Sequence, residues 1–214
     1  MTRQDVQNYQ RQRYRSVDQA LVNWREQHII EALLKRCQLQ GGSVLDVPCG
    51  YGRFTALFAR LGMIATGADV SDAMVYLARD NQIPSGRGRW LAADICHLPF
   101  ADGMFDCAFS IRLLHHRYSH DVRVHMLREL ARVSRRFVVI SFYLATPLHT
   151  MARSWRGTRG RLSMMTAAQF YDLVQQSQLH ILQQCALCRF CHAQTFAVLA
   201  KDSSLSSGDA LTRG

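Results

Sequence analysis

Short apolar runs alternate along this chain with longer segments whose apolar positions recur every three or four residues. The short runs are bounded by turn residues and predict buried strands, whereas the longer segments predict amphipathic helices. Strands are expected at 43–47, 63–69, 89–94, 105–111 and 136–142, and helices at 18–36, 52–60, 71–79 and 121–133. Because strands and helices alternate, we predict a parallel sheet with helices on both faces.

The alternation breaks after residue 142. Residues 143–165 contain a proline, two glycines and four arginines and predict an irregular insertion. A helix is expected from Thr166 to about 176, followed by a hairpin of two strands near 179–188 and 194–200. The predicted fold is therefore α/β: a Rossmann-like, doubly wound, seven-stranded, mostly parallel sheet with a C-terminal antiparallel hairpin.

The periodicity also predicts which helix faces are buried, and the pattern along the chain divides it into three regions. In 18–36 the apolar face consists of Leu21, Trp24, Ile29, Ile30, Leu33 and Leu34, and in 121–133 of Val124, Leu127, Leu130 and Ala131. We expect residues 1–40 to form a helical extension or lid, and residues 41–201 to form the main domain. Residues 202–214 are rich in serine and glycine and predict a disordered tail.

Composition narrows the class of protein. The 214 residues are 48% apolar, enough for one core, but no apolar run reaches the ~18 residues of a membrane-spanning helix. Residues 1–12 are polar, so we expect no secretory signal. The seven scattered cysteines favour reduced thiols and a cytoplasmic location. The net charge of +10 favours an anionic partner: nucleic acid, a phosphorylated small molecule or an acidic membrane surface.

Residues 44–55 contain the most informative motif. An apolar run ends at Asp46 and turns through Gly50 and Gly52 into a helical pattern. Glycine lacks a Cβ, so such a loop brings backbone N–H groups close to a ligand. Two further acids, Asp69 and Asp94, end the next two predicted strands. Since the carboxyl ends of parallel strands share one edge of the sheet, we expect these acids to lie near the loop.

These motifs resemble those of the class I S-adenosylmethionine-dependent methyltransferases over roughly residues 43–200. The resemblance implies that the loop wraps the methionine and ribose of S-adenosyl-L-methionine, that Asp69 binds both ribose hydroxyls and that Asp94 meets the adenine amino group. The implied cofactor-binding residues are Asp46, Pro48, Gly50, Gly52, Asp69, Val70, Asp94, Ile95, Ser110 and Ile111. The chemistry agrees, because one carboxylate can accept both hydroxyls of a ribose.

Pro48 departs from the family pattern, which usually has glycine at this position. Proline fixes φ and removes an N–H, so the loop must adopt a conformation that proline tolerates. A dinucleotide is the rival cofactor, but Pro48 and Thr55 stand where its G-x-G-x-x-G fingerprint requires small residues. A Rossmann-type domain whose loop holds no ligand is a further alternative.

His115 and His116 follow the predicted strand 105–111 and are expected near the methyl donor. Methyl transfer from a sulfonium mainly requires a nucleophile held in line with the methyl group. If the acceptor must also lose a proton, a neutral imidazole can act as the general base, so these two residues are the catalytic candidates. The alternative is that the pair packs at a helix start.

Four residues after the predicted strand 136–142 are candidates for the acceptor site: Tyr143, His149, Arg153 and Arg156. In the family that the chain resembles, the segment after this strand often helps to build that site, here an insertion at about 143–165. Arginine forks recognise phosphate and carboxylate in a bidentate manner, which favours an anionic acceptor. Loop packing and a solvated surface remain the alternatives.

The spacing Cys185-x-x-Cys188-x-x-Cys191-His192 competes with this interpretation, because such thiolates can hold zinc or part of an iron–sulfur cluster. In a strand, however, Cys185 and Cys188 point to opposite faces, and no second cysteine pair lies nearby. We therefore predict no metal site.

Three functions follow. The first is a methyltransferase that acts on a small-molecule or lipid-linked acceptor, including anionic ones. The second is an RNA methyltransferase, prompted by the positive charge, which predicts salt-dependent RNA binding. Ser110-Ile111-Arg112-Leu113 lacks the Asn-Pro-Pro-Tyr or Asp-Pro-Pro-Tyr motif of related enzymes that methylate a nucleobase amine. The third is a noncatalytic partner protein that keeps the fold, for which Pro48 is the support. The sequence leaves the methylated atom and the oligomeric state open.

Overall fold

The computed structural model describes residues 17–80, 88–145, 163–188 and 192–201. The helices are α2 (Val17–Arg36), α3 (Thr55–Arg60), α4 (Asp72–Asp80), α5 (His120–Val133) and α7 (Ala167–Gln176). The strands are β1 (Ser43–Asp46), β2 (Ile64–Asp69), β3 (Arg89–Ala92), β4 (Phe105–Ser110), β5 (Ser134–Tyr143), β6 (Leu179–Cys188) and β7 (His192–Lys201). Each element predicted for these parts of the chain is present, with ends displaced by no more than a few residues.

The strands form one sheet in the order β3-β2-β1-β4-β5-β7-β6. Strands β1 to β5 pair in parallel, whereas β7 is antiparallel to both β5 and β6. The strand order reverses between β1 and β4, and ligands of such sheets bind in the crevice at the carboxyl ends of these strands. The predicted Rossmann-like fold with a C-terminal antiparallel hairpin is confirmed.

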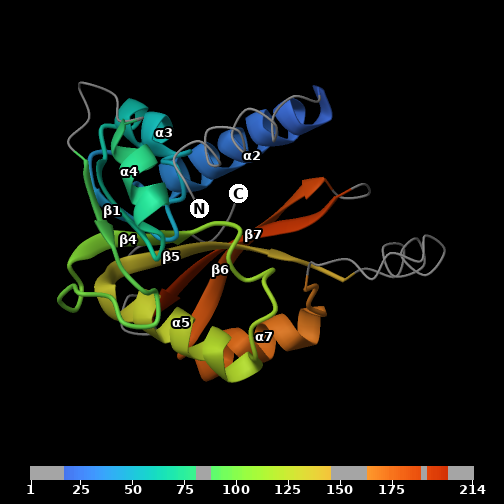
Figure 1. Cartoon of the computed structure of the whole chain (residues 1–214). Helices are drawn as coiled ribbons and strands as arrows, with labels where there is room; N and C mark the ends of the chain where they lie inside the picture. Colours follow the sequence, from blue (N-terminus) through green and yellow to red (C-terminus); the bar gives the residue numbers. More distant parts are fainter. Residues whose placement is uncertain (1–16, 81–87, 146–162, 189–191, 202–214) are drawn as a thin grey trace.

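The sheet separates two layers of helices, with α2, α3 and α4 on one face and α5 and α7 on the other (Figure 1). Alternate residues of β5 serve the two faces. Phe137 and Val139 belong to the hydrophobic cluster that includes α2 and α3, whereas Val138 and Ile140 belong to the cluster that includes α5 and α7. Successive side chains of a strand point to opposite faces, so one central strand contributes to both cores.

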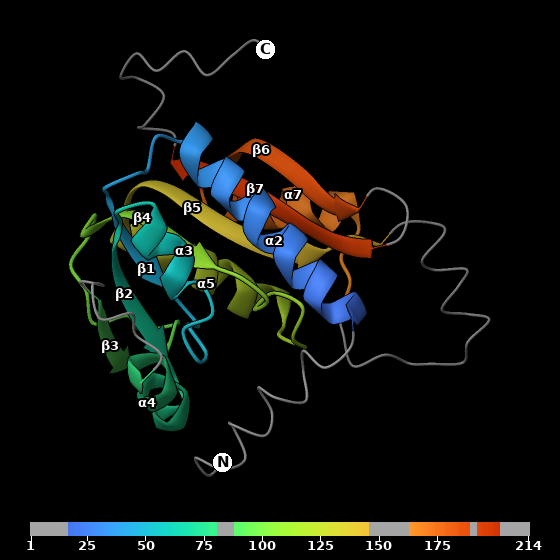
Figure 2. The same cartoon turned by 90° about the horizontal axis from the view of Figure 1, so that it is seen from above.

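Helix α2 lies across the sheet over β6 and β7 (Figure 2), and its second half is buried as predicted, at Ile30, Leu33 and Leu34. The prediction is wrong for the first half, because Leu21 and Trp24 are 62% and 56% exposed. In this half of the helix the buried side chain is instead that of Glu26, which forms ion pairs with Arg53 and Arg112. In α5 the predicted inward positions, Val124, Leu127, Leu130 and Ala131, are all buried.

Among the helices that the structure describes, none has both the length and the apolar character that crossing a membrane requires. The predicted tail at 202–214 and the first residues of the predicted extension, 1–16, lie outside the described residues.

Candidate functional site

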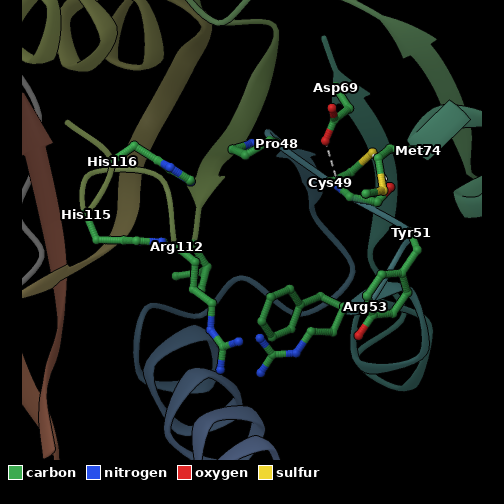
Figure 3. A pocket seen from close by; sticks show the side chains of 12 residues that line it. Pro48, Cys49, Tyr51, Arg53, Asp69, Met74, Arg112, His115 and His116 are labelled. Carbon is green, nitrogen blue, oxygen red and sulfur yellow. Dashed lines mark hydrogen bonds between the residues drawn. The ribbon is translucent and has the colours of Figure 1, made fainter. Parts of the chain in front are cut away.

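A cavity of about 340 Å³ lies at the carboxyl ends of β1, β2 and β4, where the strand order reverses (Figure 3). The loop after β1 lines it with residues 48–51, 53 and 54, and the segment after β4 lines it with Ile111, Arg112, His115 and His116. Asp69 at the end of β2 and Met74 on α4 complete the wall. The volume is typical of a small-molecule site.

The loop after β1 has the tight geometry that its glycines predict. Gly50 and Gly52 have φ angles of 53° and 78°, in the left-handed region that favours glycine. A Cβ on Gly52 would lie 2.9 Å from Thr55 Oγ1 and 3.2 Å from the Ala78 Cα. Pro48 follows a cis peptide bond and lines the cavity. These turns delay the start of α3 to Thr55, three residues after the predicted position.

Asp69 is buried at the end of β2 and is fixed by two backbone N–H groups. The Gly50 N–H donates to Oδ2 at 2.9 Å, and the Ser71 N–H donates to Oδ1 at 3.0 Å. Each carboxylate oxygen has two acceptor positions, so both retain one for a ligand. Val70, the next predicted site residue, is 77% exposed and does not line the cavity.

Asp46 is buried at the end of β1 and does not line the cavity either. Burial, together with the nearby charge of Asp69, raises the pKa of Asp46 well above its usual range against the opposing effect of Arg53. Burial also raises the pKa of the Cys49 thiol, which lines the cavity.

The other predicted cofactor residues lie around the same strand ends. The Ala93 N–H donates to the Asp69 carbonyl at 3.0 Å, which keeps the segment after β3 beside β2. The next residue, Asp94, is exposed, and its Oδ1 accepts from the Cys96 N–H at 2.9 Å. Ile95 and Ser110 are buried away from the cavity lining.

The two candidate catalytic histidines stack on each other, with ring centroids 4.4 Å apart. The ring of His115 also meets the edge of Tyr143, at 5.4 Å. The structure thus places the two histidines beside Tyr143, the last residue of β5, which does not itself line the cavity. Their turn is held by Arg123, whose Nη2 donates to the His116 carbonyl at 3.1 Å and to Ser163 Oγ at 2.7 Å. The acceptor candidates His149, Arg153 and Arg156 lie outside the described residues.

Sequence reasoning missed a buried ionic cluster beside the cavity. Glu26 of α2 is 0% exposed and accepts hydrogen bonds from Arg53, Arg112 and Gln194. Burial raises the pKa of Glu26, but the charges and hydrogen bonds of its partners outweigh that effect and hold it below the usual range. The available signal was the helical spacing, since Glu26 lies four residues from both Val22 and Ile30 on the side of the core. A charge at such a position requires buried partners.

Cys185 and Cys188 lie half-buried on β6, and Cys191 falls outside the described residues. Within the described ranges, no group of three or more His, Cys, Asp or Glu is placed to hold a metal ion. The absence of a metal site stays a prediction.

The described residues form an α/β domain with a cavity at the switch point of its sheet, and several known proteins are similar to this chain in sequence or fold. Residues 44–136 match a family described as a methyltransferase domain. The methyltransferase GfsG of Streptomyces halstedii is 37% identical over 114 residues, which are 51% of this chain and 40% of that protein. The mouse (Mus musculus) tRNA (carboxymethyluridine(34)-5-O)-methyltransferase ALKBH8 is 34% identical over 95 residues, 44% of this chain and 13% of that protein.

Among solved structures, the magnesium protoporphyrin IX methyltransferase of Synechocystis PCC 6803, with bound S-adenosylhomocysteine, has a TM-score of 0.74 at 20% identity. That match covers 87% of this chain and 88% of the other. Residues 44–136 of this chain are thus similar to methyltransferase domains, and the described residues share the fold of a methyltransferase solved with bound S-adenosylhomocysteine. The matched regions span less than half the length of the curated relatives named above.

Proposed function

We propose that this protein transfers the methyl group of S-adenosyl-L-methionine to a small-molecule or lipid-linked acceptor, with anionic acceptors included. The observation that carries the proposal is the placement of Asp69. Its carboxylate is fixed by two backbone N–H groups at one side of the cavity, and His115 and His116 line another side (Figure 3). In the proposal, a ligand whose hydroxyl groups donate to Asp69 lies in the same cavity as the two imidazoles, each of which can act as a base.

The residues of the cavity suit this cofactor. The free acceptor positions of Asp69 match the two hydroxyls of a ribose, and the left-handed turn at Gly50 brings main chain close to the ligand. When bound, the cofactor supplies a methyl group activated by a positively charged sulfur. In the proposal the loop of Pro48, Gly50 and Gly52 holds the methionine end, and Asp94 with Ile95 borders the adenine. Asp46, Val70, Ser110 and Ile111 support these contacts from the ends of β1, β2 and β4.

On the acceptor side, His115, His116 and Tyr143 form one aromatic group at the ends of β4 and β5. We assign to it the orientation of the nucleophile and, where the acceptor carries an acidic proton, the removal of that proton by an imidazole. Tyr143, His149, Arg153 and Arg156 are proposed to recognise the acceptor. The proposal that the acceptor is anionic rests on the arginines of that segment, because guanidinium groups bind phosphate and carboxylate.

An RNA acceptor is the second candidate. The net charge of +10 favours a polyanion, and a tRNA methyltransferase is among the similar proteins. RNA binding of this kind weakens steeply with salt, because it releases counterions.

Isothermal titration calorimetry with S-adenosyl-L-methionine, followed by incubation with the methyl-labelled cofactor, tests the proposal. Separate pools of small metabolites, extracted lipids and total RNA serve as acceptors, each at low and at physiological salt. We expect cofactor binding, and label in the metabolite or lipid pool. Label in RNA alone would support the second candidate. Binding without label in any pool would support the noncatalytic alternative, and absence of binding would refute the proposal.

A further inference from the structure

Two cavity-lining arginines from distant parts of the chain meet at one carboxylate of α2. Arg53 lies in the loop after β1, and Arg112 lies just after β4. The Nη2 atoms of Arg53 and Arg112 both donate to Oε2 of Glu26, and the distance from Arg112 is 2.7 Å. Nε of Arg112 also donates to Oε1 of Glu26, at 3.3 Å. Figure 3 shows the two guanidinium groups side by side, next to α2. Glu26 thus joins both loops of the cavity to the N-terminal helix.

The negative charge of Glu26 favours the observed positions of the Arg53 and Arg112 guanidinium groups. Two guanidinium ions that approach one oxygen repel each other, and a carboxylate between them offsets that repulsion. A carboxylate removed from water is itself costly unless it is paired and hydrogen-bonded. Glu26 meets this condition through the arginines and through Gln194, whose Nε2 donates to Oε1 at 2.7 Å. The cluster therefore consists of two cations and one anion, joined by hydrogen bonds to the same carboxylate.

Further contacts fix the orientation of each arginine. Nε of Arg53 donates to Asn23 Oδ1 at 2.8 Å, one turn before Glu26 on the same helix. The Arg112 backbone N–H donates to Ser141 Oγ at 2.8 Å. The side chains of Arg53 and Arg112 are only 10% and 19% exposed. Such buried, multiply bonded ion pairs differ from exposed surface pairs, which contribute little.

The cavity consequently has charged side chains at both ends, with Pro48, Phe54 and Ile111 among the apolar residues of its wall. Asp69 lies at one end, and the guanidinium groups of Arg53 and Arg112 lie at the other (Figure 3). A ligand that matches both ends presents hydroxyl donors at one end and an anion at the other. Arginine binds a carboxylate through short, charge-assisted hydrogen bonds.

We propose that Glu26 is a positioning residue, which holds Arg53 and Arg112 as a carboxylate-binding end of this cavity. The inference rests on the proposed function, because it assumes that the nucleoside of the cofactor occupies the same cavity. The carboxylate belongs either to the methionine end of the cofactor or to the acceptor.

Glu26→Gln tests the role of Glu26, since it keeps the shape and removes the charge. Glu31→Gln is the matched control, because Glu31 lies on the same helix but pairs with Lys35 and Arg60 at the surface. Calorimetry on the full chain measures the Kd of S-adenosylhomocysteine, which has the carboxylate, and of 5′-methylthioadenosine, which lacks it. If the cofactor supplies the carboxylate, Glu26→Gln raises the Kd of S-adenosylhomocysteine about 10- to 100-fold, the size of one charge-assisted hydrogen bond, and leaves the Kd of 5′-methylthioadenosine unchanged.

The direction of the effect distinguishes positioning from simple electrostatics. If Glu26 only reduced the positive charge, its neutralisation would tighten S-adenosylhomocysteine binding and overturn the inference. Equal weakening of both nucleosides would show a merely structural role and would also overturn it. If Glu26→Gln does not fold, Arg53→Gln and Arg112→Gln provide the same comparison. A wild-type protein that binds neither nucleoside would refute the proposed function itself.

Acetate, followed through the arginine Nε–H signals in NMR spectra, identifies the source of the carboxylate. If the methionine end of the cofactor occupies the site, acetate shifts the Arg53 and Arg112 signals with 5′-methylthioadenosine bound but not with S-adenosylhomocysteine bound. If the acceptor supplies the carboxylate, acetate shifts them in both complexes, and neither arginine variant weakens S-adenosylhomocysteine binding. Signals that acetate shifts in neither complex would refute the carboxylate-binding end.

Discussion

The backbone N–H of Gly50 donates a 2.9 Å hydrogen bond to Oδ2 of Asp69, and so joins the glycine-rich loop to the end of β2. The two residues are 19 positions apart in the chain. A carboxylate in this position both orders the loop and faces the cavity. The geometry of the loop and the wall of the cavity are therefore coupled through one side chain.

Replacement of Asp69 by alanine is expected to weaken binding of S-adenosyl-L-methionine about 10- to 100-fold, because it removes charge-assisted hydrogen bonds of about 1.5–3 kcal/mol. Calorimetry measures the Kd. Asp72→Ala is the matched control, since Asp72 is an exposed acid three residues on in the first turn of α4. An unchanged Kd for Asp69→Ala would remove the basis of the proposed function.

Gly52→Ala is expected to destabilise the fold more than Gly41→Ala does. Both glycines have similar positive φ angles, 78° and 74°, so each alanine costs about 1–2 kcal/mol of backbone strain. Only Gly52 has close neighbours, with the Ala78 Cα 3.2 Å from the new Cβ, whereas Gly41 has nothing within 4 Å. Urea denaturation of the two variants compares their free energies of unfolding. Equal losses would mean that the contact with α4 has no effect.

Asp46→Asn is expected to change how stability depends on pH. Burial and the charge of Asp69 raise the pKa of Asp46, so between about 3.8 and that higher value the native state keeps a proton that the unfolded chain loses. The contribution of Asp46 to wild-type stability then falls as pH rises through this window, at most about 1.4 kcal/mol per pH unit. The variant lacks this decline. Urea denaturation at a series of pH values should show the variant gaining on the wild type as pH rises.

Asp106→Asn is expected to change the pH dependence of stability in the opposite direction. Burial raises the pKa of Asp106, but hydrogen bonds from Ser43 and the charges of Arg135 and Arg136 lower it further, so the net pKa lies below the usual value. Asp106 therefore stabilises the fold above about pH 3.8, and this contribution is lost as pH falls through the native pKa. The variant should be less stable than the wild type at neutral pH and approach it in acid. Parallel pH profiles for the two variants would contradict at least one of the two assignments.

The double variant His115→Gln/His116→Gln is expected to lower kcat by about 10²- to 10⁴-fold with a labelled acceptor, while the Kd of S-adenosylhomocysteine stays unchanged. Glutamine can form hydrogen bonds but cannot act as a base near neutral pH. His97→Gln/His125→Gln is the control, because these two exposed histidines also have neighbouring rings, with centroids 5.7 Å apart, but do not line the cavity. An unchanged kcat in the double variant would assign the stacked pair to packing alone.

The local pattern predicted the elements and, among the expected cofactor residues, placed Pro48, Gly50, Asp69 and Ile111 at the cavity wall. Gly50, Gly52 and Asp69 could be recognised because a tight turn and a strand end have residue requirements that appear within a few positions. The faces of α5 were predicted for the same reason, since helical periodicity is a local property. The exposure of Leu21 and Trp24 was not predictable in this way, because it depends on what lies opposite α2.

By itself the sequence determined the alternation of strands and helices, the glycine-rich turn and the acids at the strand ends, because each is specified by neighbouring residues. Only the tertiary structure decided that Glu26 lies between Arg53 and Arg112, and that His115 meets Tyr143. The partners of Glu26 are 27, 86 and 168 positions away. A buried charge selects such partners through the packing of whole elements, and that packing has no counterpart in the local sequence.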